Sequence, residues 1–446
     1  MNAHDAGRRP GPLWPSLLPP ESQGDDSLCA VSAHGVRVRF ADGRELLCGS
    51  SGLWNTNLGY GNPAIAAATA EALLAASYLG VFRYENRYAR LAAAELVRVC
   101  GADHYARVLF STSGGAANDL VMKLARHYHA LRGEPRRNLV VGLRDSYHGL
   151  TYGSFGLTGE PLGQQLYGVD QRLVRHVGVN DPADISTLME RQGDRVAAVV
   201  VEPVIGSGAV PLTAEYIDTL LRLREQYGFL LVADEVATGF GRTGPFFASQ
   251  EWPAHPDLLV ASKGLTNGTA AAAAVVASHR VADTFTQTGA VLMHGETQAG
   301  TPATCAAIVA TIAEMQRLDA LALGRRLSAL LDTALARLAQ DHPLVSGSTG
   351  AGCFRSLRIR TPEGTPLPQS EVSALVSRIR AAGAIVHPGV NGIQLIPALT
   401  YSPAELTELL DCVLTGLAAF AETAYPGWAA EAPRSSTVPQ LLGTGS

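Results

Sequence analysis

Leu258-Leu-Val-Ala-Ser-Lys263 is a short apolar run that ends in a serine and a lysine, and it follows a similar run, Leu230-Leu-Val-Ala-Asp234, that ends in an aspartate. Both runs are too apolar for surface segments and have the length of strands buried in a sheet. From about residue 60 to residue 305, such runs alternate with stretches of helical periodicity, which is typical of βαβ units. The sequence therefore predicts an α/β fold in which a large domain has a mostly parallel sheet flanked by helices.

Individual elements follow from the periodicity and from the residues that end them. Thr213 is a good N-cap and Gly228 a good stop for a helix between them. An Asp42-Gly43 turn between alternating segments predicts a hairpin. The expected strands are 138–143, 196–201, 229–233, 258–261 and 271–277, and the expected helices of this region include 116–131 and 214–227.

The chain of 446 residues is longer than one hydrophobic core usually serves, so we expect more than one domain. After residue 302 the pattern changes to long helices and short strands, which predicts a smaller α+β domain built from both chain ends. The expected segments are a Pro-rich N-terminal arm that docks its apolar side chains (1–25), the N-terminal part of the small domain (26–59), a large cofactor-binding domain (60–305), the C-terminal small domain (306–425) and a mobile tail (426–446).

Composition excludes several classes of function. Hydrophobic residues make up 47% and charged residues 17% of the chain, which suits a folded soluble protein rather than a disordered one. The net charge of −5 and the lack of a basic block predict no nucleic-acid partner. Six scattered cysteines, no apolar signal segment and no run long enough to span a bilayer predict a cytoplasmic protein with no membrane partner.

Lys263 and Asp234 are the residues that indicate the chemistry. In an open α/β sheet, ligands bind at the carboxyl ends of the strands, where both residues are expected. A buried amine there can bond a cofactor aldehyde as a Schiff base, and a neighbouring carboxylate can keep a pyridine nitrogen protonated. The pair is therefore typical of an enzyme that uses pyridoxal 5'-phosphate, and a single surface lysine or aspartate is the alternative interpretation.

Other candidate residues follow neighbouring strands. Gly114 and Gly115 connect a strand to a helix, and free backbone N–H groups at a helix N-terminus bind phosphate. Tyr147 and His148 follow the strand that ends near residue 143, where an aromatic ring can stack on a pyridine ring. Glu202 directly follows the strand 196–201. A core tyrosine and a structural histidine are the alternatives, and no ligand spacing around His148 indicates a metal.

Taken together, the chain resembles the class III aminotransferases, pyridoxal-phosphate enzymes of fold type I, from about residue 49 to residue 400. The motifs that carry the resemblance are Ser113-Gly-Gly-Ala-Ala-Asn118, Lys123-Leu-Ala-Arg126, Tyr147-His-Gly149, Glu202-Pro-Val204, the run from Asp234 to Gly244, Ser262-Lys-Gly-Leu265 and His294-Gly-Glu-Thr297.

The resemblance implies a role for each matching residue. Lys263 would form the Schiff base with the cofactor and then carry the proton, while Asp234 would pair with the pyridinium. Tyr147 and Val236 would cover the two faces of the ring, and Glu202 would support its substrate side. The glycines 114 and 115 would hold the phosphate, with His148 also at the cofactor and Thr297 reaching the phosphate of the partner subunit in a homodimer.

Departures from the family pattern bear on the substrate. Ala116 stands where many relatives have glutamate, and Thr301 stands where the usual residue is histidine. His387 stands where many relatives have an arginine that grips a substrate carboxylate. A carbonyl acceptor without an adjacent carboxylate is therefore favoured, and Trp54 resembles the pocket tryptophan of amine-type members, with a core tryptophan as the alternative. The arginines that remain as candidates for a donor carboxylate are 83, 242, 355 and 358.

Three segments, 13–20, 50–55 and 77–86, are similar to the aminotransferases of daptide-type ribosomal peptide pathways, which aminate a ketone at a peptide C-terminus. The resemblance thus predicts amino transfer from a donor amino acid or amine to a ketone or aldehyde, including such a peptide ketone. Other reactions of the same cofactor, namely decarboxylation, racemisation or an internal amino shift, are the alternatives. A dehydrogenase is disfavoured because no Gly-x-Gly-x-x-Gly follows the first strand.

Overall fold

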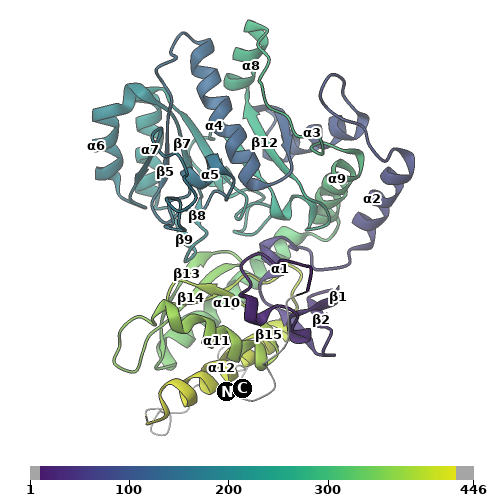
Figure 1. Ribbon diagram of the computed structural model, residues 1–446, viewed down its shortest axis with the longest axis vertical. Coiled ribbons are helices and arrows are strands. Elements are labelled where there is room, and N and C mark those ends of the chain that lie inside the picture. Colours follow the sequence, from purple (N-terminus) through teal and green to yellow (C-terminus); the bar gives the residue numbers. More distant parts are fainter. Residues whose placement is uncertain (1–10, 428–446) are drawn as a thin grey trace.

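The computed structural model describes residues 11–427, which form two parts that meet at a narrow waist (Figure 1). The upper part in Figure 1 contains a large sheet between helices, and the lower part contains smaller sheets and the last three helices of the described chain. These three helices are α10 (Ala320–Asp341), α11 (Gln369–Ala381) and α12 (Pro403–Ala424).

Seven strands within residues 11–427 form the large sheet, in the order β4-β12-β11-β10-β7-β5-β6. Neighbouring strands from β11 to β6 run parallel, whereas β12 runs antiparallel to both β11 and β4. The predicted mostly parallel sheet is confirmed, and β12 makes it mixed. The bounds are β4 (Tyr105–Ser111), β5 (Leu139–Leu143), β6 (Val174–Val177), β7 (Val196–Val201), β10 (Leu230–Asp234), β11 (Leu258–Ala261) and β12 (Ala273–Ser278).

Helices cover both faces of this sheet, so its strands are buried on both sides. Alternate strand residues point to opposite faces, so Val200 and Val232 pack with one set of helices, while Val199 and Leu231 pack with the other. The first set includes α4 (Gly114–Leu131), α5 (Tyr152–Leu157) and α8 (His279–Thr288), and the second includes α6 (Pro182–Gln192) and α7 (Ala214–Tyr227). The helices α2 (Pro63–Ala75), α3 (Arg87–Cys100) and α9 (Pro302–Arg317) pack together beside β4.

Local sequence signals set the ends of the helices. The Thr213 hydroxyl accepts a hydrogen bond from the Tyr216 N–H at 3.2 Å, and Gly228 ends α7 with a φ of 75°, so both predicted ends are confirmed. Helix α4 begins two residues before the predicted start because Ser113 acts as its N-cap. The glycines 114 and 115 therefore lie in the first turn of the helix.

The lower part joins the beginning and the end of the described chain. Its first sheet has the order β1-β2-β3-β15, in which β15 (Ala384–Ile385) pairs in parallel with β3 (Glu45–Cys48). The predicted α+β unit built from both chain ends is confirmed, while the exact domain boundaries stay a prediction. The remaining strands are β1 (Ala30–His34), β2 (Arg37–Phe40), β13 (Val345–Ala351), β14 (Phe354–Ile359), β16 (His387–Gly389) and β17 (Gly392–Leu395).

Some expectations from the sequence stay predictions, one element was missed, and others lie outside the described residues. The apolar side chains of the N-terminal arm do not dock within the described chain, since Leu13, Trp14 and Leu17 are exposed by 75%, 90% and 96%. Strand β6 at the sheet edge was not predicted. The expected mobile tail lies almost entirely outside the described residues. Within residues 11–427, no helix combines the length and apolar character needed to cross a bilayer.

Candidate active site

The carboxyl ends of three parallel strands bring the main candidate residues together. Asp234 is the last residue of β10 and pairs in register with Val260 of β11. Lys263 follows β11 after one intervening residue and adopts a left-handed backbone conformation with a φ of 41°. Glu202 directly follows β7, the other neighbour of β10. This topology places the three residues at one edge of the sheet, where the sequence analysis expected them.

Asp234 is buried and receives hydrogen bonds from three sides. Its Oδ2 accepts from His148 Nδ1 at 2.7 Å and from Asn118 Nδ2 at 2.8 Å, while its Oδ1 accepts from the Val236 N–H at 3.1 Å. Burial lowers the pKa of His148, but the hydrogen bond and charge of Asp234, with the charge of Glu202, raise it above its usual value overall. A carboxylate held by three donors is fixed in orientation.

The sequence analysis included Asn118 in a motif but gave it no role of its own. Its side chain also donates to the backbone carbonyl of His148 at 3.0 Å, so it ties Asp234 to the loop after β5. Asn118 lies one helical turn after Gly114 on α4. That spacing places both on the same face of the helix, which is the signal that was available in the sequence.

The Lys263 amine lies at the centre of the site. Among the described residues it has no hydrogen bond or ion pair, and its Nζ lies 4.3 Å from the centre of the Trp54 ring. Burial lowers the pKa of Lys263 below its usual value, while the charges of Glu202 and Asp234 act in the opposite direction. An amine without a partner in a buried site is available to react.

Glu202 is a buried carboxyl beside this amine. Its Oε1 accepts a hydrogen bond from the Tyr147 N–H at 2.9 Å, and its Oε2 accepts from the Gly206 N–H at 3.0 Å. Burial raises the pKa of Glu202 to about 7, and the charge of His148 partly offsets that effect. The ring of Tyr147, by contrast, is 39% exposed at the mouth of the site.

The glycine turn, residues 113–115, offers free donors. Ser113 Oγ accepts from the Ala116 N–H at 3.2 Å, and the Ser113 carbonyl accepts from the Ala117 N–H at 2.9 Å. No hydrogen bond within residues 11–427 uses the N–H groups of Gly114 and Gly115. A Cβ on Gly114 would lie 3.2 Å from a Val236 methyl, so the turn lies directly against Val236. Such a turn is suited to bind an anion.

The wall of the pocket next to Lys263 comes from the lower part of the molecule. The Trp54 ring lies 5.1 Å from the rings of both Phe354 and His387. Burial, followed by the charge of Lys263, lowers the pKa of His387 to about 4, so its imidazole is neutral at pH 7. The indole Nε1 of Trp54 is buried and has no hydrogen-bond partner within residues 11–427. The wall is thus aromatic and uncharged.

The predicted arginines either have structural partners or are exposed, and Thr297 is exposed. Arg242 is fully buried and donates to the Pro397 carbonyl at 2.5 Å and to Asn57 Oδ1 at 2.6 Å, so the fold itself uses this guanidinium. Arg355 pairs with Asp332 at 2.5 Å. The arginines 83 and 358 are exposed, and Thr297 is exposed in a segment without helix or strand.

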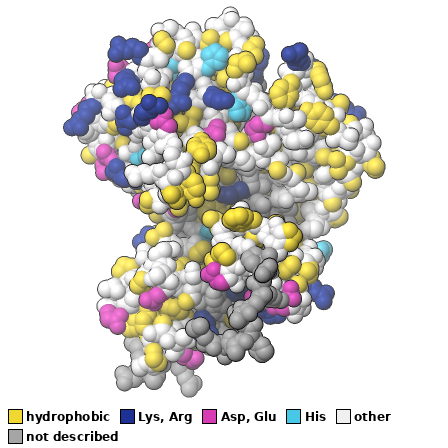
Figure 2. Space-filling view, viewed as in Figure 1, with side chains coloured by type: hydrophobic (Ala, Val, Ile, Leu, Met, Phe, Trp, Pro, Cys, Tyr) yellow, Lys and Arg dark blue, Asp and Glu magenta, His cyan; other side chains and the backbone are white. Residues whose placement is uncertain are grey.

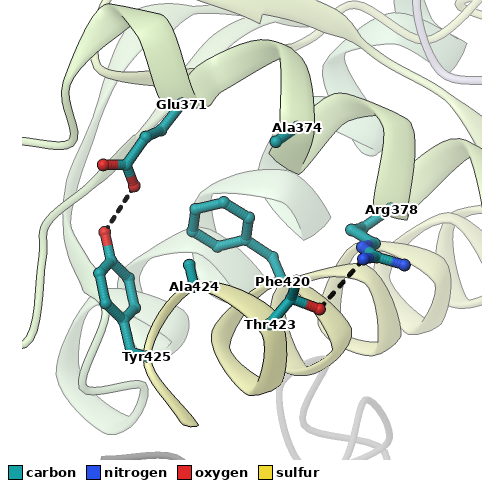
Figure 3. A pocket seen from close by; sticks show the side chains of 7 residues that line it. All are labelled: Glu371, Ala374, Arg378, Phe420, Thr423, Ala424 and Tyr425. Carbon is teal, nitrogen blue, oxygen red and sulfur yellow. Dashed lines mark hydrogen bonds between the residues drawn. The ribbon is translucent and has the colours of Figure 1, made fainter. Parts of the chain in front are cut away.

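A cavity lies in the lower part of the molecule, separate from the predicted site. It has a volume of about 290 Å³ and lies between α11 and α12, with Phe420 between a Tyr425–Glu371 and an Arg378–Thr423 hydrogen bond (Figure 3). The residues that line it include none of the site residues predicted from the sequence. Within the described chain, no group of His, Cys, Asp and Glu residues has an arrangement that would hold a metal ion.

Comparison with known proteins identifies the family. The family model described as aminotransferase class-III matches residues 21–415. This chain belongs to the class III aminotransferases. Among curated relatives of this class III aminotransferase, the diaminobutyrate–2-oxoglutarate transaminase of Halomonas elongata is 30% identical over 72% of this chain and 74% of that protein. The acetylornithine aminotransferase of Neisseria meningitidis serogroup B is 31% identical over 88% of this chain and 94% of that protein.

Solved structures agree with this assignment. An amine transaminase from an uncultivated Pseudomonas species, solved in its PLP-bound form, has a TM-score of 0.85 at 27% identity, covering 93% of this chain and 99% of that one. The class III aminotransferase described here therefore has the fold of the PLP-dependent transaminases, uses PLP as its cofactor, and moves an amino group from a donor to a keto acceptor.

Proposed function

We propose that the residues around Lys263 hold the cofactor and that each has a defined role. Lys263 bonds the cofactor aldehyde, and the Asp234 carboxylate pairs with the pyridinium nitrogen. The free N–H groups of Gly114 and Gly115 bind the phosphate at the N-terminus of α4. Val236 covers one face of the ring and Tyr147 the other. The single observation that carries this proposal is the Lys263 amine, which has no hydrogen bond or ion pair in the described chain. The charges of Asp234 and Glu202 are close enough to act on its pKa.

The residues around the proposed cofactor ring also have roles in the reaction itself. When bound, PLP supplies an electron sink for the carbon that loses its proton. The lowered pKa of Lys263 favours a neutral amine, which can take a proton from the donor and return it at the acceptor. His148 and Asn118 hold the Asp234 carboxylate in its orientation, and Glu202 closes the substrate side of the ring. These roles explain why the buried polar groups of the site converge.

For the acceptor, we propose a ketone or aldehyde that has no carboxylate next to its carbonyl. The pocket wall supports this choice, because Trp54 and Phe354 are apolar and His387 is neutral at pH 7. A carboxylate buried against such a wall would lose its hydration without a charged partner. The ketone at the C-terminus of a modified peptide satisfies this requirement, since it carries no carboxylate. The donor is an amino acid or amine.

The active form is proposed to be a homodimer in which Thr297 of one subunit reaches the phosphate of the other. Large apolar side chains are exposed around the mouth of the site, including Phe82 at 60%, Tyr152 at 70% and Met293 at 85%. Figure 2 shows hydrophobic side chains on both sides of the waist on this face. Exposed apolar side chains of this size favour protein association, and Thr297 is exposed two residues after Gly295, the glycine that Phe82 packs against.

Half-reactions test the acceptor. The purified enzyme is first mixed with single amino donors and then with single carbonyl compounds, and the visible absorbance of the cofactor reports each half-reaction. Methyl ketones on peptide amides should restore the absorbance faster than pyruvate or 2-oxoglutarate. The variant His387→Arg should improve kcat/KM for the α-keto acids by about tenfold, since it adds a bidentate carboxylate partner, whereas the control His387→Gln should not. Equal α-keto acid use by both variants would remove position 387 from the pocket.

The dimer is tested by light scattering and by subunit mixing. In the proposed dimer, each site takes Lys263 from one subunit and Thr297 from the other. Lys263→Ala removes only the lysine, and Thr297→Ala removes only the threonine. A hybrid dimer then contains one site with both Lys263 and the Thr297 of the other subunit. Mixing the two inactive or weakened variants should therefore restore cofactor binding and turnover to one of the two sites in each hybrid dimer. A monodisperse monomer, or no recovery on mixing, would refute the shared site.

A further inference from the structure

The Glu296 carboxylate contacts the residues that directly precede the glycine turn. Its Oε1 accepts a hydrogen bond from Ser111 Oγ at 2.5 Å, and its Oε2 accepts from the Thr112 N–H at 3.0 Å and also from the Thr112 hydroxyl. Glu296 lies on the segment between α8 and α9, far from Ser111 in sequence. One side chain thus receives three hydrogen bonds from two consecutive residues at the end of β4.

The surroundings keep this carboxylate charged and in place. Burial raises the pKa of Glu296, but the hydrogen bonds from Ser111, Thr112 and His294 outweigh that effect and lower it overall. His294 Nε2 lies 3.5 Å from the carboxylate, and Lys123 Nζ lies 3.5 Å from the other ring nitrogen of His294. The negative charge of Glu296 therefore faces a chain of basic groups on its outer side.

Two contacts hold the segment that carries Glu296. The Tyr78 hydroxyl donates to the Thr297 carbonyl at 3.1 Å. A Cβ on Gly295 would lie 2.7 Å from the ring of Phe82, so this ring packs directly on the backbone there. The segment is thus fixed between residues 78–82 and the end of β4, and Glu296 forms the link to β4.

The direction of the N–H groups in the glycine turn depends on the backbone that precedes it. Gly114 and Gly115 have no side chains to anchor, and the N–H groups that would meet the phosphate take their direction from the residues before them. Ser111 is the last residue of β4 and pairs with Ala273 of β12. Thr112 is the one residue between that strand and the Ser113 N-cap. Its backbone N–H and hydroxyl are both held by Glu296.

From this geometry we infer that Glu296 is a positioning residue for the cofactor phosphate. It does not touch the phosphate, and acts by fixing Thr112 so that the N–H groups of the glycine turn converge. The inference rests on the proposed binding of the phosphate by the glycine turn. It predicts that the loss of Glu296 weakens the binding of phosphorylated ligands and leaves the binding of their unphosphorylated forms unchanged.

The test compares two ligands that differ only in the phosphate group, pyridoxamine 5'-phosphate and pyridoxamine. Neither ligand bonds covalently to Lys263, so their affinities report the pocket alone. The full-length chain is freed of cofactor, and both ligands are titrated by fluorescence. Glu296→Gln keeps the shape of the side chain but places an amide N–H₂ against the donors of Ser111 and Thr112. We expect the Kd of pyridoxamine 5'-phosphate to increase at least tenfold and the Kd of pyridoxamine to change less than twofold.

Two controls make the outcome decisive. Glu134→Gln changes a carboxylate beyond the other end of α4, where Glu134 bonds His129, and should alter neither affinity. Ser111→Ala removes a single donor to Glu296 and should weaken phosphorylated-ligand binding in the same direction by a smaller factor, which serves if Glu296→Gln does not fold. Equal affinity of folded Glu296→Gln and the unaltered chain for the phosphorylated ligand would overturn the inference, as would an equal loss for both ligands. If the unaltered chain itself bound both ligands equally, the proposed phosphate site would fail instead.

Discussion

The titration of Glu202 makes stability depend on pH in a way that can be measured. Burial raises the pKa of Glu202 to about 7 from an ordinary value of 4.5. The folded chain therefore holds this proton more tightly than the unfolded chain does. The resulting contribution to the free energy of unfolding is fully present below pH 4.5, decreases as the pH rises from 4.5 to about 7, and is absent above that. The variant Glu202→Gln cannot lose a proton and lacks this dependence.

The size of the effect follows from the two pKa values. A pKa of about 7 in the folded chain and 4.5 in the unfolded chain corresponds to a change of roughly 3 kcal/mol across the titration. For a cooperative chain of 446 residues, this equals a shift in melting temperature of about 3 °C. Glu202→Gln also loses one acceptor for the N–H of Tyr147 or Gly206, so the variant should be less stable than the unaltered chain at pH 5.

Melting temperatures of the cofactor-free proteins at pH 5, 6, 7 and 8 test this reasoning. The melting temperature of Glu202→Gln minus that of the unaltered chain should increase by about 3 °C from pH 5 to pH 8. Glu134→Gln is the control without a trend in this pH range, because a hydrogen bond from His129 lowers the pKa of Glu134 below its usual value of 4.5, so that its stability contribution changes only at lower pH. A difference that stays constant with pH, or falls, would show that Glu202 is ionised throughout and that burial does not raise its pKa.

Three further substitutions test other parts of the site. Lys263→Ala should abolish the borohydride-trappable bond between chain and cofactor, and mass spectrometry that finds the label on another lysine would refute the assignment. Asp234→Asn should lower kcat by about 100-fold or more with an unchanged circular dichroism spectrum, because the ring nitrogen loses its charge partner; normal turnover would exclude Asp234 from the reaction. Gly149→Ala should lower the free energy of unfolding by about 2 kcal/mol or more, as its Cβ would lie 2.4 Å from the Gly115 Cα at a φ of 125°. Gly133→Ala, which has a positive φ but open space, should cost about 1 kcal/mol in chemical denaturation, and an equal loss in both variants would contradict the packing argument.

Much of the large sheet and of its catalytic edge could be predicted from the sequence. An apolar run that ends in a charge is a local pattern, and Lys263, Asp234 and Glu202 each directly follow or end such a run. Parallel strands place their carboxyl ends at one edge, so local patterns are sufficient to bring these residues together. Helix caps are also local, which is why the ends of α7 were correct. The orientation of β12 was not predicted, because strand direction depends on the path of the chain between strands.

The sequence by itself determined the fold class, the cofactor chemistry and the edge of the sheet where that chemistry lies, because periodicity, caps and strand ends act over a few residues. Tertiary structure alone decided the partners of those residues. The neutral wall of Trp54, Phe354 and His387, and the contact of Glu296 with Ser111, join segments separated by more than a hundred residues. Such contacts arise only when segments far apart in the sequence pack together, and this packing produces the burial that sets the pKa values of His387 and Glu202.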